Sequence, residues 1–264
     1  MKILVIGDFH GKFTDKQVKK LKKENPAFVF SPGDFCGNEN WGKIFFKHFY
    51  AKNERERKKV PKIVKDALKK EEKIATENGI LVLKKLTRFE KPLYAVHGNW
   101  DPGPYGTDLL AGKLEYTKSD VKRFRNVGKR NFNFMDFKVK DFGDFVLVGG
   151  TSSTAPGKVD KKSLQRFLKK YDEDDPREAK KIIKIMKRQS ARRKKKYEAV
   201  FKKAKNLKKP IVFLTHNCPY NTKLDLIRDK KADKLAKGKH YGSYLERLII
   251  KRFKPDLVLC GHMQ

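Results

Sequence analysis

Carboxylate, imidazole and amide side chains recur directly after short apolar segments of this sequence. They occupy five loops, Gly7-Asp8-Phe9-His10-Gly11, Gly33-Asp34-Phe35-Cys36-Gly37-Asn38, His97-Gly98-Asn99-Trp100-Asp101, Thr215-His216-Asn217 and Gly261-His262-Met263-Gln264. Their oxygen and nitrogen donors suit Mn, Fe, Zn or similar cations, whereas a structural zinc site typically uses sulfur. Adjacent glycines let the backbone turn tightly beside an ion. We therefore predict a metal centre built from residues far apart in the sequence.

Each of these side chains also has a structural explanation when it is considered alone. Asp8 could cap a helix, and Asn99 could stabilise a turn. His10 and His216 could be satisfied polar residues at strand ends. Only their joint recurrence, in a consistent position after apolar segments, indicates a shared chemical role.

The apolar segments predict buried strands of an α/β fold. They cover residues 3–6, 27–30, 93–96, 145–148, 211–214 and 257–260, and five of the six lead into a loop with metal-type ligands. Helical patterns lie between several of them, as in Val18 with Leu21 and Leu245 with Ile249. Because the carboxyl ends of strands form a crevice in such sheets, the loops are expected to converge there. Residues 132–139 and 142–148 instead predict an antiparallel hairpin.

Two stretches, at about 41–86 and 158–209, are predicted to be helical insertions. The first has three-to-four spacing of the apolar residues Val60, Ile63, Val64, Ala67, Leu68, Ile74 and Ala75. In the second, Asp175 and Glu178 suit a capping box, with Pro176 as first helical residue. The apolar stripe that follows predicts one long docked helix and comprises Ala179, Ile182, Ile183, Met186, Tyr197, Val200, Phe201 and Ala204.

The charge balance is strongly basic, with 65 Lys and Arg against 31 Asp and Glu and a net charge of +34. Residues 158–209 alone hold 22 basic and 7 acidic residues. Such a field attracts polyanions, nucleic acid above all. A thermophile's charged surface, or an ordinary solvated helix face, explains it as well. The predicted nucleic-acid contacts are Arg192, Arg193, Lys194, Lys195 and Lys196.

Cysteine usage and hydropathy favour a cytoplasmic protein. Cys36, Cys218 and Cys260 are too few and too scattered for a disulfide framework or a CxxC zinc site. The apolar run at residues 3–6 is far shorter than a signal-peptide core, and no other stretch is long enough to span a bilayer. We expect no membrane partner, and the oligomeric state stays open.

The order of the five loops resembles the motifs of the calcineurin-like metallophosphoesterase superfamily, D-x-H, G-D, G-N-H-D, a strand-terminal H and G-H-x-H. The segments at 215–225 and 240–243 resemble an archaeal-type branch. The resemblance implies a four-layer αββα sandwich of two mixed sheets, forming a single domain over residues 1–264. Relatives continue with further strands after the last motif, so the resemblance leaves open whether C-terminal strands are missing.

The resemblance also implies a site for two divalent metal ions, manganese first, with Fe, Zn, Ni or Mg as alternatives. The implied ligands are Asp8, His10, Asp34, Asn99, His216, His262 and Gln264, with Asp34 bridging both ions. The implied reaction is hydrolysis of a phosphate ester by metal-bound hydroxide, since two ions can activate water and brace both oxygens of the displacement.

Two residues depart from the family pattern. Trp100 replaces a histidine that acts on the leaving group, and Gln264 replaces a ligand histidine. Because indole is not an acid, phosphodiesters or activated esters should react better than alkyl monoesters. We hypothesise that His97 or His240 supplies the proton and include Asp101 among the catalytic residues. A weakened scaffold that binds nucleic acid, and a small-molecule phosphatase, are the alternative functions.

Overall fold

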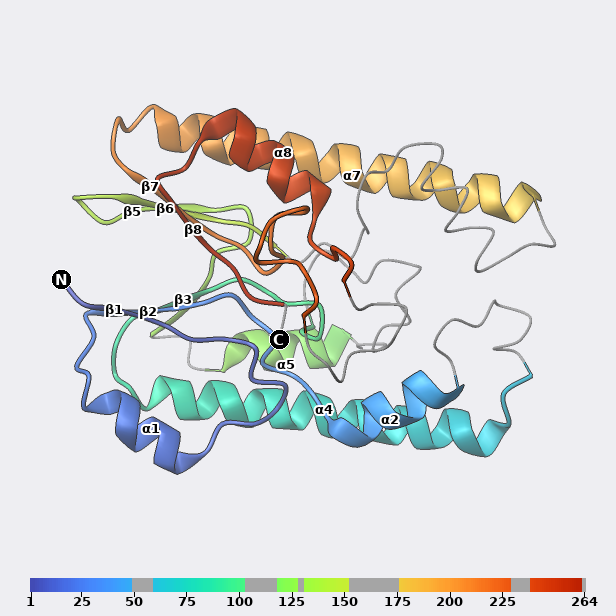
Figure 1. The fold of residues 1–264 in the computed structure, drawn as a ribbon. Helices are drawn as coiled ribbons and strands as arrows, with labels where there is room; N and C mark the ends of the chain where they lie inside the picture. Colours follow the sequence, from blue (N-terminus) through green and yellow to red (C-terminus); the bar gives the residue numbers. More distant parts are fainter. Residues whose placement is uncertain (49–58, 103–117, 128–130, 152–175, 229–237, 263–264) are drawn as a thin grey trace.

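Two four-stranded sheets lie face to face between two layers of helices (Figure 1). This computed structural model describes residues 1–48, 59–102, 118–127, 131–151, 176–228 and 238–262. The predicted α/β fold with four layers is therefore confirmed. In the described residues, no helix combines the length and apolar character needed to cross a membrane.

The first sheet has the strand order β1-β2-β3-β4, and its three pairings are parallel. Its strands are β1 (Ile3–Val5), β2 (Phe28–Ser31), β3 (Leu93–Ala95) and β4 (Phe132–Phe134). Parallel pairing brings the carboxyl ends of all four strands to one edge. The loops after β1, β2 and β3 therefore start side by side.

The second sheet is mixed and has the order β5-β6-β7-β8. It contains β5 (Val139–Asp141), β6 (Val146–Gly149), β7 (Ile211–Leu214) and β8 (Leu257–Leu259), with only β5 antiparallel to its neighbour. The expected hairpin is thus shorter than predicted. Residues 132–134 pair with the first sheet instead, because the chain crosses between sheets at residues 135–138.

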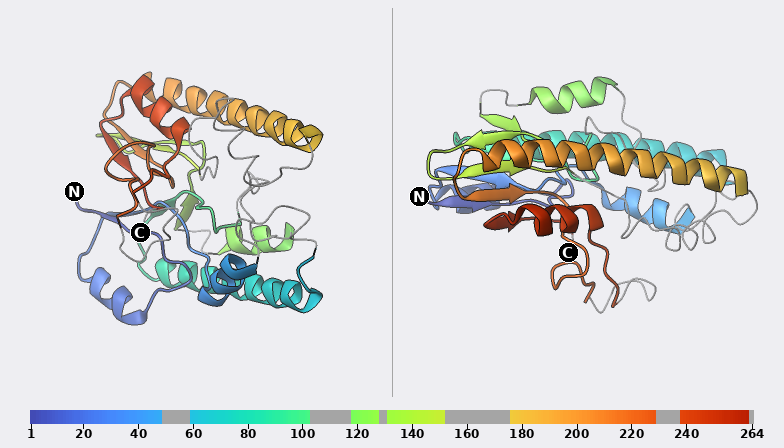
Figure 2. Two further views of the ribbon diagram at one scale, coloured as in Figure 1. Left: turned by 45° about the vertical axis from the view of Figure 1, so that its right-hand side comes forward. Right: turned by 90° about the horizontal axis from the view of Figure 1, so that it is seen from above.

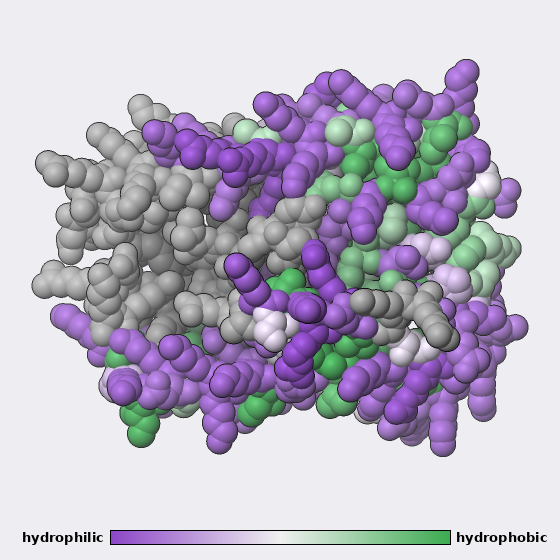
Figure 3. Space-filling view, turned by 180° about the vertical axis from the view of Figure 1, so that it is seen from behind, coloured by the Kyte–Doolittle hydropathy of each residue, from purple (hydrophilic) through white to green (hydrophobic). Residues whose placement is uncertain are grey.

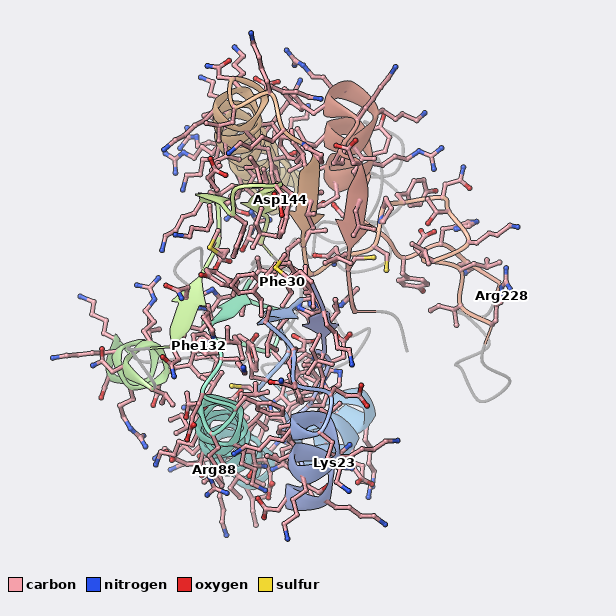
Figure 4. All side chains as sticks on the ribbon, turned by 90° about the vertical axis from the view of Figure 1, so that its left-hand side faces the viewer. Lys23, Phe30, Arg88, Phe132, Asp144 and Arg228 are labelled. Carbon is pink, nitrogen blue, oxygen red and sulfur yellow. The ribbon has the colours of Figure 1, made fainter. Side chains whose placement is uncertain are left out.

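The strands read as continuous apolar runs because both faces of each sheet are buried. In β2, Phe28 and Phe30 point into the layer between the sheets, whereas Val29 packs against the outer helices. In β7, Leu214 faces inward and Phe213 packs outward. Figure 4 shows Phe30 between the two sheets, and Lys23 and Arg88 at the outer helical layer.

In the described residues, the outer layer beside the first sheet contains α1 (Asp15–Lys22), α2 (Glu39–His48), α4 (Lys62–Thr87) and α5 (Lys118–Asn126). The apolar spacing correctly predicts α4, but Ile63 and Ile74 are 78% and 39% exposed. Burial is concentrated in the second half of α4, where Ile80, Leu83 and Leu86 join the outer core. This half therefore belongs to the packed body of the domain.

The second sheet is covered by α7 (Pro176–Lys205) and α8 (Tyr244–Phe253). The long helix starts at Pro176, as predicted, and its Tyr197, Phe201 and Ala204 are fully buried against the sheet. Figure 2 shows the first half of α7 extending beyond the strands in both views. Asp175, which was predicted to take part in the capping box of this helix, lies outside the described residues. Whether 41–86 and 158–209 are insertions remains a prediction.

Candidate metal centre

The side chains with metal-type donors converge at the carboxyl ends of the two inner sheets. His216 follows β7, and its Nδ1 donates to the carbonyl oxygen of Pro32, after β2, over 2.8 Å. His262 follows β8, and its backbone N–H donates to Asp8 Oδ1, after β1, over 2.9 Å. These two hydrogen bonds join the sheets at this edge, so loops far apart in sequence form one site.

Asp34 belongs to two clusters of candidate ligands. In the first, donor atoms of Asp8, His10 and Asp34 lie within 4.8 Å of one another, and the same limit holds for Asp34, His216 and His262 in the second. Asp34 Oδ2 is 3.8 Å from His10 Nε2 and 3.4 Å from His216 Nε2. A carboxylate placed between two donor groups has the geometry to contact two cations.

The hydrogen bonds of His216 test whether these residues fit a cation. Because Nδ1 donates its proton to Pro32, the neutral ring carries a lone pair on Nε2. That atom lies 2.7 Å from Asn99 Oδ1 and 3.1 Å from His262 Nδ1. His216 is fully buried, so lone pairs that faced one another here would be costly, and a cation between these three atoms would remove that cost. The three atoms therefore fit a divalent cation as common ligands.

Four candidate ligands occupy the left-handed backbone region. Asp8, His10, Asp34 and His262 have φ values of 52°, 45°, 56° and 75°. This conformation is unfavourable for residues with side chains and concentrates at functional sites. A Cβ on Gly98 would lie 2.0 Å from Asp34 Oδ1. The backbone is therefore shaped to turn these donors inward, and Gly98 provides the necessary room.

Burial affects the two donors of the first cluster in opposite directions. Desolvation lowers the pKa of His10, against the attraction of Asp8, and so favours the neutral ring that can ligate a metal. Desolvation also raises the pKa of Asp8, although the backbone N–H of His262 and the charge of His10 oppose it. A cation beside Asp8 would offset the cost of keeping that carboxylate charged.

Asp101 holds the loop of Asp34 in place through hydrogen bonds to its backbone. Its Oδ2 accepts the backbone N–H groups of Asp34 and Gly98, both at 2.8 Å. Its Oδ1 accepts those of Phe35 at 2.8 Å and Cys36 at 3.0 Å. Burial raises the pKa of Asp101 despite these four donors. These contacts support a positioning role, and the catalytic role of Asp101 stays a prediction.

Trp100 lies beside the first cluster, where the family pattern has a histidine. Its ring centroid is 5.5 Å from that of His10 and 4.7 Å from that of Trp41, both in edge-to-face contact. Its backbone N–H donates to Asp34 Oδ1 over 2.9 Å. The indole therefore fills the place next to the cluster with an apolar ring that cannot donate a proton to an alkoxide.

The two histidines predicted to replace that acid have different surroundings. His97 is 2% exposed, bonds Asp136 Oδ2 through Nδ1 at 2.6 Å and stacks on Phe134. The interior position does not support direct proton donation by His97. The His240 side chain is 29% exposed, and its Nδ1 lies 2.9 Å from Asp225 Oδ1. Of the two, only His240 offers a ring edge to solvent.

The predicted basic run at residues 192–196 lies on α7, but its side chains do not share one environment. Arg193 is only 7% exposed, and the Nζ of Lys196 lies 5.3 Å from the ring centroid of Phe137. Arg192, Lys194 and Lys195 are exposed. Consecutive residues point around a helix, so a run of five cannot form one contact surface. The burial of Arg193 argues against a direct contact there, and the nucleic-acid role of the run stays a prediction. The predicted metal ligand Gln264 lies outside the described residues.

Sequence reasoning missed three features of the site. Asp136 was hidden inside the strand predicted at 132–139, although it follows β4 as the ligands follow their strands. Asp225 is fully buried and accepts the backbone N–H groups of Asn221, Thr222 and Gly242. The free thiols of Cys218 and Cys260 lie 3.3 Å apart, two residues from His216 and His262 respectively. No sequence signal pairs those cysteines.

Carboxylates, imidazoles and an amide grouped at this edge of an α/β sandwich are the ligand set of a metal-dependent enzyme. The profile of calcineurin-like phosphoesterases matches residues 1–264. The chain therefore belongs to this family and is a metal-dependent phosphoesterase. Among curated proteins, no sequence matches it. A solved crystal structure with 15% sequence identity is similar to this chain, with a TM-score of 0.54. The match covers 99% of this chain and 84% of the chain in that crystal structure, which supports the fold.

Proposed function

We propose that the protein hydrolyses phosphodiesters at a centre of two divalent cations. The observation that carries the proposal is the place of Asp34, whose Oδ2 lies between His10 of one cluster and His216 of the other. Asp8 and His10 would hold one cation, and Asn99, His216 and His262 the other. The mixed donors favour manganese, with Fe, Zn, Ni or Mg as alternatives.

Two bound cations would supply charge stabilisation and a water of lowered pKa. The chain itself fixes the donors. Asp101 holds the backbone of Asp34 and Gly98, and the Pro32 carbonyl holds the His216 ring with Nε2 toward the cluster. Because these supports are buried, the donors need little rearrangement when cations and substrate bind.

The preference for diesters or activated esters rests on Trp100. An alkoxide leaving group gains from a proton donor, which is worth about 10²–10⁴-fold in rate. Trp100 occupies the place beside His10 and has no acidic proton for this purpose. Esters with stable leaving anions depend least on an acid, so they are the expected substrates. A cytoplasmic location is proposed with this function, because three scattered cysteines are too few for a disulfide framework.

We also propose His240 as the residual proton donor. Asp225 binds its Nδ1 and keeps Nε2 directed away from that carboxylate. Burial opposes ionisation of Asp225, but the backbone N–H of Thr222 and the ring of His240 lower its pKa. If His240 acts, His240→Ala slows diesters of poor leaving groups more than nitrophenyl esters. A parallel His97→Ala variant should show no such selectivity, and equal effects of both leaving groups would remove the assignment.

The enzyme is tested with bis-para-nitrophenyl phosphate and added Mn²⁺. Wild-type protein should release nitrophenolate, and Asp34→Ala should lose at least about 10³-fold because both cations lose a ligand. Elemental analysis after dialysis should find two equivalents of metal for the wild type. One equivalent, or turnover unaffected by Asp34→Ala, would contradict the two-cation centre.

A further inference from the structure

The solvent side of α7 carries a straight row of cations. Its members are exposed, are spaced by three, four or seven residues, and are Lys184, Arg188, Arg192, Lys195 and Lys202. This spacing places them on one face of an α-helix. Tyr197, Phe201 and Ala204 occupy the opposite face and are fully buried. Packing against the second sheet therefore fixes the row outward.

The row is long and regular. Residues 184 to 202 span about 27 Å at 1.5 Å per residue, and neighbours one turn apart are about 6 Å from each other. Ala199 occupies the single gap on this face and is exposed. A small side chain there leaves the row unobstructed.

Among the described residues, no ion pair joins an acidic side chain to this row. Within residues 184–205 the sequence has one acid, Glu198, and its carboxylate pairs with Arg252 of α8. Hydrophilic side chains cover the rim of the molecule along α7 (Figure 3). Within the described part of the chain, the row therefore presents positive charge to solvent.

We propose that this row binds the phosphate backbone of single-stranded nucleic acid. The row can follow one line of phosphates, exposed Lys187, Lys194 and Lys203 on α7 add positive charge beside it, and about 27 Å of helix can contact several consecutive nucleotides. An extended strand can follow a straight helix face without the groove that a folded protein partner would require. This binding is independent of the proposed diester hydrolysis, because none of the row residues belongs to the metal centre.

The direction of α7 determines where the row leads relative to the metal centre. Its first half extends beyond the strands on the side where they end at their carboxyl termini (Figures 1 and 2). The row therefore leads from the second sheet toward the edge that carries the metal centre. A nucleic-acid strand bound to the row would therefore lie on the side of the molecule that carries the metal centre.

Binding is measured by fluorescence anisotropy with a labelled 20-nucleotide oligothymidylate. The protein carries Asp34→Ala and the buffer contains EDTA, so hydrolysis does not interfere. The test variant is Arg188→Gln, Arg192→Gln, Lys195→Gln. We expect binding to weaken by about tenfold or more at 0.1 M salt. The slope of log K against log salt should also become shallower by about 2, because each of the three lost phosphate contacts contributes about 0.7.

The matched control is Lys16→Gln, Lys19→Gln, Lys20→Gln on α1, which removes the same charge from three exposed residues on the opposite side of the molecule. It should bind as tightly as the parent. Equal weakening of both triples would mean that net charge alone attracts the strand and would overturn the proposal. Tighter binding of a 20-base-pair duplex, or of phosphatidylserine vesicles, to the row would also overturn it. Circular dichroism melting should show the same fold for all variants.

Discussion

At the scale of single residues, the site depends on side chains that support the donors as much as on the donors. Asp101 occupies the motif position beside Trp100, yet it bonds four backbone N–H groups of the neighbouring loops. A carboxylate in a motif that resembles the family pattern suggests proton transfer or ligation. Only the tertiary structure shows that its oxygens already accept hydrogen bonds from the backbone.

Replacing Trp100 tests whether the missing acid limits the reaction. Trp100→His should raise turnover of phosphodiesters with alkyl leaving groups by about tenfold or more, because a positioned acid can protonate the departing oxygen. Rates for nitrophenyl esters should change much less. The measurement is kcat across a series of leaving groups, with Trp100→Phe as the control that removes the indole without adding an acid. Equal gains for both classes of ester would contradict this explanation.

The Cys218 and Cys260 thiols provide a second residue-scale prediction. Their sulfur atoms are 3.3 Å apart, so a small rotation brings them to the bonding distance of about 2.05 Å. Diamide should oxidise this pair to an intramolecular disulfide, while buried Cys36 stays a thiol. Mass spectrometry of alkylated tryptic peptides checks the pairing. A Cys218→Ser variant should form no intramolecular disulfide, and pairing of Cys36 with either residue would contradict the prediction.

At the scale of secondary-structure elements, α4 supports the loop that carries Asp34. Gly79 lies where the helix touches that loop, and an added Cβ would meet Cys36 Sγ at 2.3 Å and Cys36 Cα at 3.0 Å. Apolar spacing predicts the helix but not this contact. The glycine has a low helix propensity, so its position is explained by the close approach of the backbone of another segment.

Two glycine substitutions separate helix propensity from this close approach. Gly79→Ala should lower the free energy of unfolding by about 1–3 kcal/mol, because the loop of Cys36 must shift. Gly42→Ala in α2 meets no atom within 4 Å and should raise it by about 0.5–1 kcal/mol. Urea denaturation monitored by circular dichroism measures both. Stabilisation by both alanines would show that the α4 contact yields easily.

At the scale of the whole molecule, the metal centre joins the two sheets. The first sheet contributes Asp8, His10, Asp34 and Asn99, and the second contributes His216 and His262. Cations bound between them therefore favour the folded sandwich over separated halves. This linkage makes stability depend on metal concentration.

Thermal unfolding tests the linkage. Mn²⁺ at 100 times its dissociation constant should stabilise the wild type by about 2.7 kcal/mol for each occupied site, and EDTA should reverse the gain. Asp34→Asn should lose most of the effect, whereas Asp8→Asn should retain a part, because Asp34 belongs to both clusters. Differential scanning calorimetry measures the melting temperatures. Identical losses in the two variants would argue against a shared carboxylate.

The sequence determined the type of fold and the donor chemistry. Alternation of apolar segments with ligand loops predicted strands buried on both faces, and parallel strands necessarily bring such loops to one edge. It did not determine that residues 132–134 and 139–141 belong to different sheets, that His97 pairs with Asp136, or which cations of α7 form a row. Those features depend on distances between segments far apart in the chain, and only the packing of the two sheets and their helices sets these distances.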